Sequence, residues 1–199
     1  GLAGSPDPNE PSLAIGYPRM LRLLDSLQLR GTFFIEGWNV LHHPHRVREL
    51  IERGHEVALH GWVHENFASL NKLQAEQSLH DGTAAMRRIG IYPKGFRAPG
   101  GIRGAHTIGI LAALGYQYDS STEHTQQSDT ESTDFAGALE PNFIAPRLVH
   151  VPWRYSMVDS IQYLRNAAGA VTPQELEAKW LAMIDRAADR RCTMTLVIH

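Results

Sequence analysis

Two histidines four residues apart, His60 and His64, follow a short apolar run in the stretch GHEVALHGWVHENF. Imidazoles at i and i+4 face the same way if the segment after the strand is helical, and two neutral imidazoles suit Zn²⁺ or another divalent transition metal. A catalytic zinc site usually has three protein ligands plus water, so a third ligand, which we expect to be a carboxylate, must come from elsewhere. The alternative is that two of the eleven histidines fall four apart by chance and face solvent.

A second stretch that could do chemistry is GFRAPGG, residues 95–101. Pro99 with two following glycines allows a tight turn whose backbone N–H groups could stabilise a developing oxyanion. Arg97 could pair with an acidic group and fix its orientation. The alternative interpretation is a loop of turn residues with an exposed arginine.

Polar or aromatic residues stand at the carboxyl end of each expected strand. They are Glu36, His60, Arg97, Asp119, Trp153 with Arg154, and His199. In parallel α/β folds those ends gather on one face, where ligands and catalytic groups lie. The alternative is that a strand simply ends where its apolar residues end, which makes polar residues there automatic.

The elements that must position these residues alternate along the chain. Apolar periodicity, caps and glycine stops predict helices over residues 17–29, 45–52, 70–89, 105–114 and 172–190, and strands near residues 31, 56, 94, 116, 147 and 192. This order predicts parallel strands with crossover helices, in an open doubly wound sheet or a closed barrel. Residues 120–146 are polar, without a clear period and long for a connection, so we expect a functional or mobile segment, either a lid or a subunit contact.

Composition limits the class of protein. With 199 residues and 43% hydrophobic residues, we expect one domain over residues 1–199. Because the sequence opens in an expected loop and stops at the end of an expected strand, we also expect that it is a portion of a longer protein, without the first strand and the last helix of the domain. A net charge of −2 with scattered Lys and Arg predicts no nucleic-acid partner, and the absence of a long apolar run predicts no membrane partner, while a homo-oligomer stays open. The single Cys192 favours the cytoplasm, with a secreted or periplasmic protein as the alternative.

Taken together, the motifs resemble a known family. The ordered set HGWVH, RAPGG, a strand ending in Asp119 and the terminal LVIH resembles the polysaccharide deacetylases with a NodB homology domain, carbohydrate esterase family 4, over nearly the whole chain. The stretches HGWVHEN, VHVPWRYSMVD and TMTLVIH are similar to a branch that includes peptidoglycan deacetylase-like proteins and cyclic-imide or allantoin hydrolases.

This resemblance implies an α/β fold, a distorted (β/α) barrel. It implies a divalent metal, usually zinc, held by His60, His64 and an Asp that we expect upstream of Gly1. A second upstream Asp would be the base, oriented by Arg97. His199 would be the acid.

The resemblance also implies a role for the backbone N–H near Gly100, which would stabilise the oxyanion, although members commonly have an aromatic residue at that position. The tryptophan that members often have near the fourth motif is missing around Asp119, and Trp153 could take its place. We expect Asp119, Trp153 and Arg154 to contact the substrate.

The expected activity is hydrolysis of a carbon–nitrogen bond other than a peptide bond. The first hypothesis is removal of acetyl groups from N-acetylated sugar polymers or related amides by metal-activated water. The second is an allantoinase-like amidohydrolase of a small cyclic ureide or imide, with or without metal. The third is a barrel that binds sugar without catalysis.

Overall fold

The computed structural model describes residues 10–122, 140–164 and 171–199. Its sheet has the strand order β1-β2-β3-β4-β6-β5, with β5 antiparallel to β6 and the other neighbours parallel. The strands are β1 Thr32–Ile35, β2 Glu56–Leu59, β3 Gly95–Phe96, β4 Tyr118–Asp119, β5 Asn142–Ala145 and β6 Leu148–His150. The predicted α/β architecture with parallel strands is therefore confirmed.

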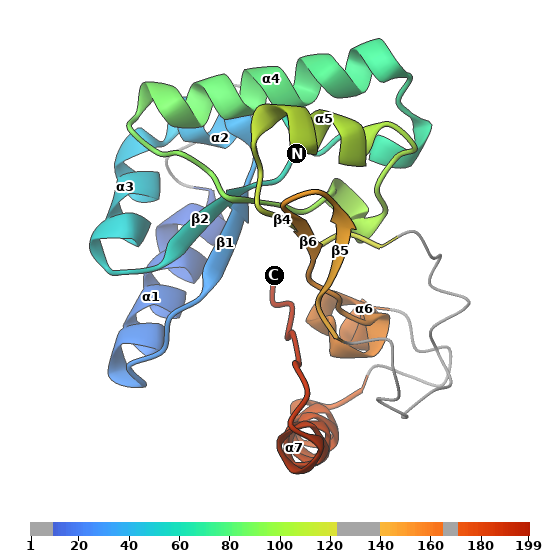
Figure 1. Cartoon of the computed structure of the whole chain (residues 1–199). Helices are drawn as coiled ribbons and strands as arrows, with labels where there is room; N and C mark the ends of the chain where they lie inside the picture. The colour runs from blue at the N-terminus through green and yellow to red at the C-terminus, as the bar shows by residue number, and fades with distance from the viewer. Residues whose placement is uncertain (1–9, 123–139, 165–170) are drawn as a thin grey trace.

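Helices connect the strands and cover the sheet (Figure 1). They are α1 Tyr17–Ser26, α2 Gly37–His42, α3 Pro44–Glu52, α4 Lys72–Arg88, α5 Thr107–Leu114, α6 Asp159–Leu164 and α7 Pro173–Arg190. In Figure 1, α4 and α5 run across one side of the sheet, whereas α6 and α7 lie beyond its other end. Thr172 and Glu175 form a capping box at the start of α7, with Pro173 in the first helical turn.

The apolar faces of these elements meet in one main core between the sheet and its helices. Its fully buried members include Leu50, Leu59, Phe67, Leu79, Met86, Phe96 and Leu111. A second, smaller cluster joins Met157 to Met183 of α7, with Trp180 packed against them. The main core fixes the carboxyl ends of β1 to β4, where the predicted site residues lie.

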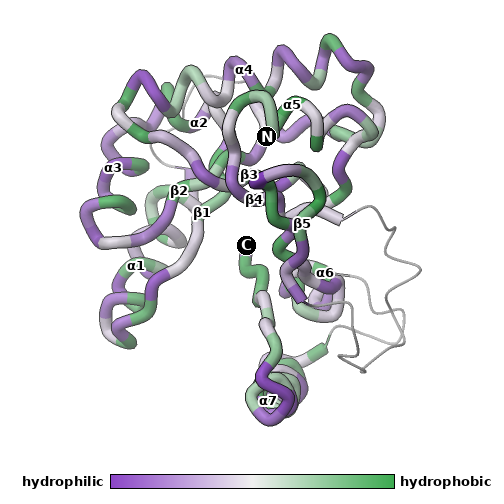
Figure 2. Tube along the Cα trace, in the orientation of Figure 1, coloured by the Kyte–Doolittle hydropathy of each residue, from purple (hydrophilic) through white to green (hydrophobic). Residues whose placement is uncertain are grey.

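The predicted strand near residue 192 is wrong. The terminal run is apolar (Figure 2), but it makes only an isolated parallel bridge between Val158 and Val197. Leu196 and Ile198 are 37% and 57% exposed, so their side chains are not buried enough to stabilise this run as a strand of the sheet. In Figure 1 the run rises from α7 towards the sheet.

Among the described α-helices and strands, three short elements were not predicted. β5 lies inside the segment 120–146, for which we expected no strand. α2 begins shortly after the end of β1, and α6 follows a single helical turn at Tyr155–Met157. Residues 123–139 of that segment lie outside the described residues, so its proposed role as a lid or a subunit contact stays a prediction.

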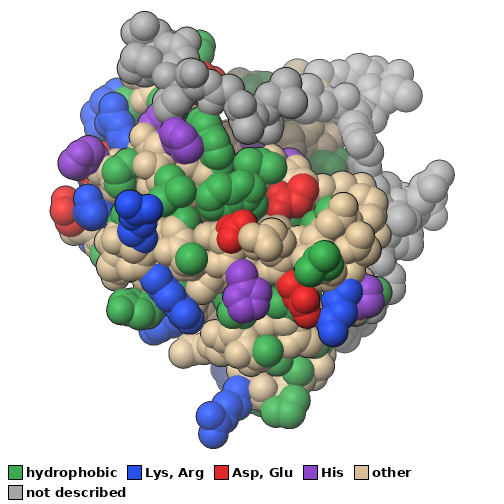
Figure 3. All heavy atoms as spheres, turned by 90° about the horizontal axis from the view of Figure 1, so that it is seen from above, with side chains coloured by type: hydrophobic (Ala, Val, Ile, Leu, Met, Phe, Trp, Pro, Cys, Tyr) green, Lys and Arg blue, Asp and Glu red, His purple; other side chains and the backbone are tan. Residues whose placement is uncertain are grey.

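The surface is consistent with the low net charge. On the face drawn in Figure 3, basic and acidic side chains are spread among neutral surface instead of gathering in one patch. In the part of the chain that the structure describes, none of the helices is long and apolar enough to cross a bilayer.

Candidate functional site

His60 follows β2 and is held by hydrogen bonds to both neighbouring strands, β1 and the end of β3. Its main-chain N–H donates to Ile35 O at 3.0 Å, and its ring Nδ1 lies 2.8 Å from the main-chain oxygen of Arg97. A carbonyl oxygen only accepts, so Nδ1 carries the proton and Nε2 keeps a free lone pair. Burial lowers the pKa of His60 to about 4, which keeps the imidazole neutral at pH 7. A neutral, oriented imidazole of this kind can ligate a metal.

His64 lies beside His60, as the spacing predicted. The two ring centroids are 5.1 Å apart, with the ring planes at 73°. The connecting residues form a turn and not a helix, and in this turn Gly61 has φ +73° and His64 has φ +66°. The pair therefore meets because the chain turns back on itself after β2.

These two imidazoles fit two positions of a metal's ligand set. Among residues 10–122, 140–164 and 171–199, no group of three or more His, Cys, Asp or Glu side chains could hold a metal ion. The described residues thus offer two imidazoles side by side, whereas a catalytic zinc site usually has three protein ligands.

Arg97 is buried at the end of β3. Its Nε donates to Ser120 O at 3.0 Å and its Nη2 to Ser120 Oγ at 2.8 Å, while its Cζ lies 4.3 Å from the centre of the Phe34 ring. None of the carboxylates that the structure describes forms an ion pair with it. Burial lowers the pKa of Arg97 to about 10. Asp119 interacts with this guanidinium electrostatically but forms no ion pair with it, so a further anionic group beside Arg97 would stabilise the buried cation.

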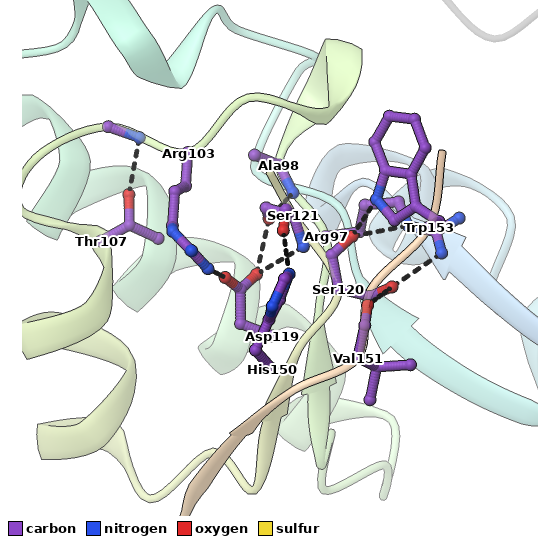
Figure 4. Close-up of polar contacts among 11 residues, drawn as sticks. Arg97, Ala98, Arg103, Thr107, Asp119, Ser120, Ser121, His150, Val151 and Trp153 are labelled. Carbon is purple, nitrogen blue, oxygen red and sulfur yellow. Dashed lines mark hydrogen bonds and ion pairs between the residues drawn. The ribbon is translucent and has the colours of Figure 1, made fainter. Parts of the chain in front are cut away.

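Asp119 is fully buried, and both oxygens of its carboxylate are bound by neighbouring residues (Figure 4). Arg103 Nη1 lies 2.5 Å from Oδ2, and Ser121 donates to Oδ1 from its N–H at 3.1 Å and from its Oγ at 2.5 Å. The same Ser121 Oγ accepts the Ala98 N–H at 2.8 Å. Asp119 therefore holds the loop that follows Arg97, and this geometry gives its expected substrate contact no support.

Trp153 closes the same cluster from the segment after β6. Its indole N–H donates to Ser120 O at 2.7 Å, and its ring packs so closely on Gly101 that a Cβ there would lie 2.4 Å from it. Gly100 is exposed with φ +69°, and a Cβ there would meet nothing within 4 Å. Arg154 is buried, with 9% of its surface exposed.

His199 is paired with an acid that the sequence reasoning missed. Its Nδ1 lies 2.6 Å from Asp159 Oδ1, and its main-chain N–H donates to Asp159 Oδ2 at 2.9 Å. Asp159 begins α6 and lies 40 residues earlier in the chain, so no local spacing could reveal the pair. Within the described residues, no hydrogen bond or ion pair links His199 to His60, His64 or Arg97.

Comparisons with known proteins agree with the predicted family. A family model described as polysaccharide deacetylase matches residues 11–118. The peptidoglycan deacetylase-like protein FGM2 of Gibberella zeae is 27% identical over 188 residues, which cover 83% of this chain and 56% of that protein. The peptidoglycan deacetylase of Helicobacter pylori is 24% identical over 192 residues, which cover 86% of this chain and 65% of that protein. This chain thus spans less than two thirds of the length of either relative.

Solved structures agree on the fold. A crystal structure of a polysaccharide deacetylase from Mycobacterium smegmatis superposes with a TM-score of 0.78 at 26% identity, covering 96% of this chain and 70% of that chain. Puue allantoinase superposes with a TM-score of 0.77 at 17% identity, covering 96% of this chain and 61% of that chain, which shows a shared fold alone. The expected NodB-type fold is therefore confirmed.

Proposed function

Because the chain belongs to the polysaccharide deacetylase family, we propose that it is a hydrolase that removes acetyl groups from N-acetylated sugar polymers. The observation that carries this proposal is the bond from His60 Nδ1 to Arg97 O, which leaves Nε2 free beside His64. The names of the relatives from G. zeae and H. pylori make a peptidoglycan-type glycan the first substrate to test.

The proposal includes a divalent metal, with zinc as the first candidate, for which His60 and His64 would be two ligands. When bound, such a metal lowers the pKa of a water molecule and polarises the amide carbonyl. The chemistry of the pair supports this, since both residues are imidazoles and His60 has its tautomer fixed by Arg97 O.

Arg97 would hold the carboxylate that takes the proton from the attacking water. Its buried guanidinium forms no ion pair with a carboxylate among the described residues, and its Nε and Nη2 are fixed on Ser120. A rigid, charged fork of this kind orients a carboxylate well. The N–H of Gly100, in the turn after Arg97, would donate to the oxyanion as the amide carbon becomes tetrahedral.

His199 would protonate the leaving amine. Asp159 accepts the Nδ1–H of His199, so Nε2 is the ring atom that can deliver a proton.

Trp153 and Arg154 would contact the sugar. The half-buried Trp153 indole is fixed on Ser120 O and on Gly101, so it can offer a rigid face for stacking beside Arg97. Gly100 has open space where a side chain would project, and this leaves room for substrate above the turn.

The experiment measures acetate released from N-acetylglucosamine oligomers and from peptidoglycan fragments, with Zn²⁺ added and after chelation. We expect acetate release that chelation abolishes, that His60→Ala removes, and that His80→Ala leaves intact, because His80 is an exposed histidine of α4. No acetate from any glycan, or a ring-opened acid from allantoin instead, would overturn the proposal.

A further inference from the structure

The turn that carries the two histidines has a backbone that needs support. Gly61 and His64 both have positive φ, at +73° and +66°, and for a residue with a Cβ, such as His64, this region is unfavourable. A turn of this kind persists only when its surroundings fix it. The groups around it therefore decide where the imidazole of His64 lies.

Glu65 binds the N–H groups of this turn. Its Oε1 accepts the Trp62 N–H at 3.0 Å, its Oε2 accepts the Val63 N–H at 2.8 Å, and Ser78 Oγ of α4 donates to Oε1. Glu65 is half-buried and Ser78 is buried. One carboxylate thus joins two backbone donors of the turn to a helix of the main core.

The carbonyl groups of the same turn are bound from the other side. The N–H of Gly37 donates to Gly61 O at 2.9 Å, and the N–H of Trp38 donates to Trp62 O at 3.0 Å. These bonds fix two carbonyls but leave the N–H side of the turn to Glu65. Loss of Glu65 would therefore leave the N–H groups of Trp62 and Val63 without this acceptor.

Helix α4 lies close enough to make this link rigid. A Cβ on Gly82 would lie 3.2 Å from Gly61 O and 2.6 Å from Leu59, so the helix touches the start of the turn. Ser78 is one helical turn before Gly82, on the same face. The bond from Ser78 to Glu65 thus ties the turn to a helix that already packs against it.

We propose that Glu65 is a positioning residue for the metal site. By accepting from Trp62, Val63 and Ser78, it fixes the turn and so the placement of the His64 imidazole beside His60. This inference rests on the proposed function, in which these histidines hold a divalent metal.

The test uses Zn²⁺ itself as the probe and the full-length protein. Variants Glu65→Gln, Glu65→Ala and Ser78→Ala are titrated against a competing chromophoric chelator, and Co²⁺ replaces Zn²⁺ for absorption spectra that report ligand geometry. Urea unfolding and near-ultraviolet circular dichroism establish that each variant is folded. The matched control is Glu76→Gln, since Glu76 also carries a carboxylate but pairs with Lys72 of its own helix.

We expect Glu65→Ala to bind Zn²⁺ at least about tenfold more weakly, in the range that outer-shell partners of metal ligands show. Glu65→Gln should lose affinity as well, because its amide NH₂ cannot accept from a backbone N–H. Ser78→Ala should lose less, because both backbone bonds to Glu65 remain. The Co²⁺ spectrum should change in the Glu65 variants and not in the control.

Two results separate the inference from the proposed function. If the unsubstituted protein binds Zn²⁺ and the folded Glu65 variants bind it equally, with the same Co²⁺ spectrum, the inference is overturned and the proposed function stands. If the unsubstituted protein binds no Zn²⁺, the metal-dependent function itself is overturned, and the inference with it.

Discussion

The Nδ1 atom of His60 lies 2.8 Å from the main-chain oxygen of Arg97, so the imidazole of His60 is hydrogen-bonded to the residue that carries the buried guanidinium. Arg97 is in turn fixed on Ser120, and the next residue, Ala98, donates to Ser121 Oγ. The carboxyl ends of β2, β3 and β4 therefore act as one unit. A change in the residues that follow β4 is expected to reach His60 through this link.

Removing the proposed acid should slow the reaction and leave metal binding intact. For His199→Ala we expect a loss in kcat of about 10²- to 10⁴-fold, the range for general acid–base catalysis. Asp159→Asn should lose less, because the ring remains but its carboxylate acceptor is gone. The measurement is acetate release beside a Zn²⁺ titration, with Asp185→Asn of α7 as the control. Full activity of His199→Ala would contradict the assigned role.

The shape of the Arg97 guanidinium should matter as much as its charge. Arg97→Lys keeps a cation but cannot form both bonds to Ser120 in one plane. We expect the free energy of unfolding to fall by about 1–3 kcal/mol, and kcat to fall as well. Urea unfolding and acetate release measure the two effects, with the exposed Arg48→Lys as control. A variant as stable and as active as the unsubstituted protein would argue against a fixed guanidinium.

Asp119 and Arg103 should behave as a buried ion pair. Asp119→Asn removes the buried carboxylate that pairs with Arg103 Nη1, so we expect a loss of about 3–5 kcal/mol of stability. Because the carboxylate holds the loop after Arg97, KM of the folded variant should change little. A double-mutant cycle with Arg103→Gln measures the coupling. A large rise in KM at unchanged stability would instead favour the substrate contact predicted from the sequence.

Buried Tyr116 should make stability depend on pH in the alkaline range. Burial raises its pKa to about 12, and its hydroxyl lies 2.8 Å from Thr83 Oγ1. Above pH 10 the unfolded chain loses this proton while the folded protein keeps it, so the free energy of unfolding falls as pH rises towards 12. Urea midpoints between pH 9 and 11 measure the slope. Tyr116→Phe should reduce it, whereas the exposed Tyr92→Phe should not.

The elements with strong periodicity could be predicted from the sequence, and the short ones could not. The helix near residues 70–89 and the strand near residue 56 have apolar residues that are buried in the structure. α2 begins directly after β1, and its N-cap residue Glu36 makes no capping bond that a pattern could reveal. β5 is an edge strand whose Phe143 is 74% exposed, so it has no burial pattern to detect.

The candidate site also contains residues that could be predicted from the sequence and residues that could not. His60 and His64 could be found because they are close in sequence and follow a strand, although the turn between them depends on Glu65 and α4. Asp159 could not be found, because its partner His199 lies 40 residues away. The expected role of Asp119 depended on its place at a strand end, which did not reveal that Arg103 and Ser121 occupy it.

The two glycines after Pro99 should differ sharply in what they tolerate. Gly100 and Gly101 both have positive φ, so alanine at either position carries backbone strain of about 1–2 kcal/mol. At Gly100 the new Cβ meets open space, whereas at Gly101 it would lie 2.4 Å from the Trp153 ring and must displace it. We expect Gly101→Ala to cost about 1–3 kcal/mol more than Gly100→Ala, in the range for overpacking, and to lower acetate release by moving Trp153 away from Arg97. Urea unfolding of the matched pair measures the difference, and equal stability would mean that Trp153 does not pack on Gly101.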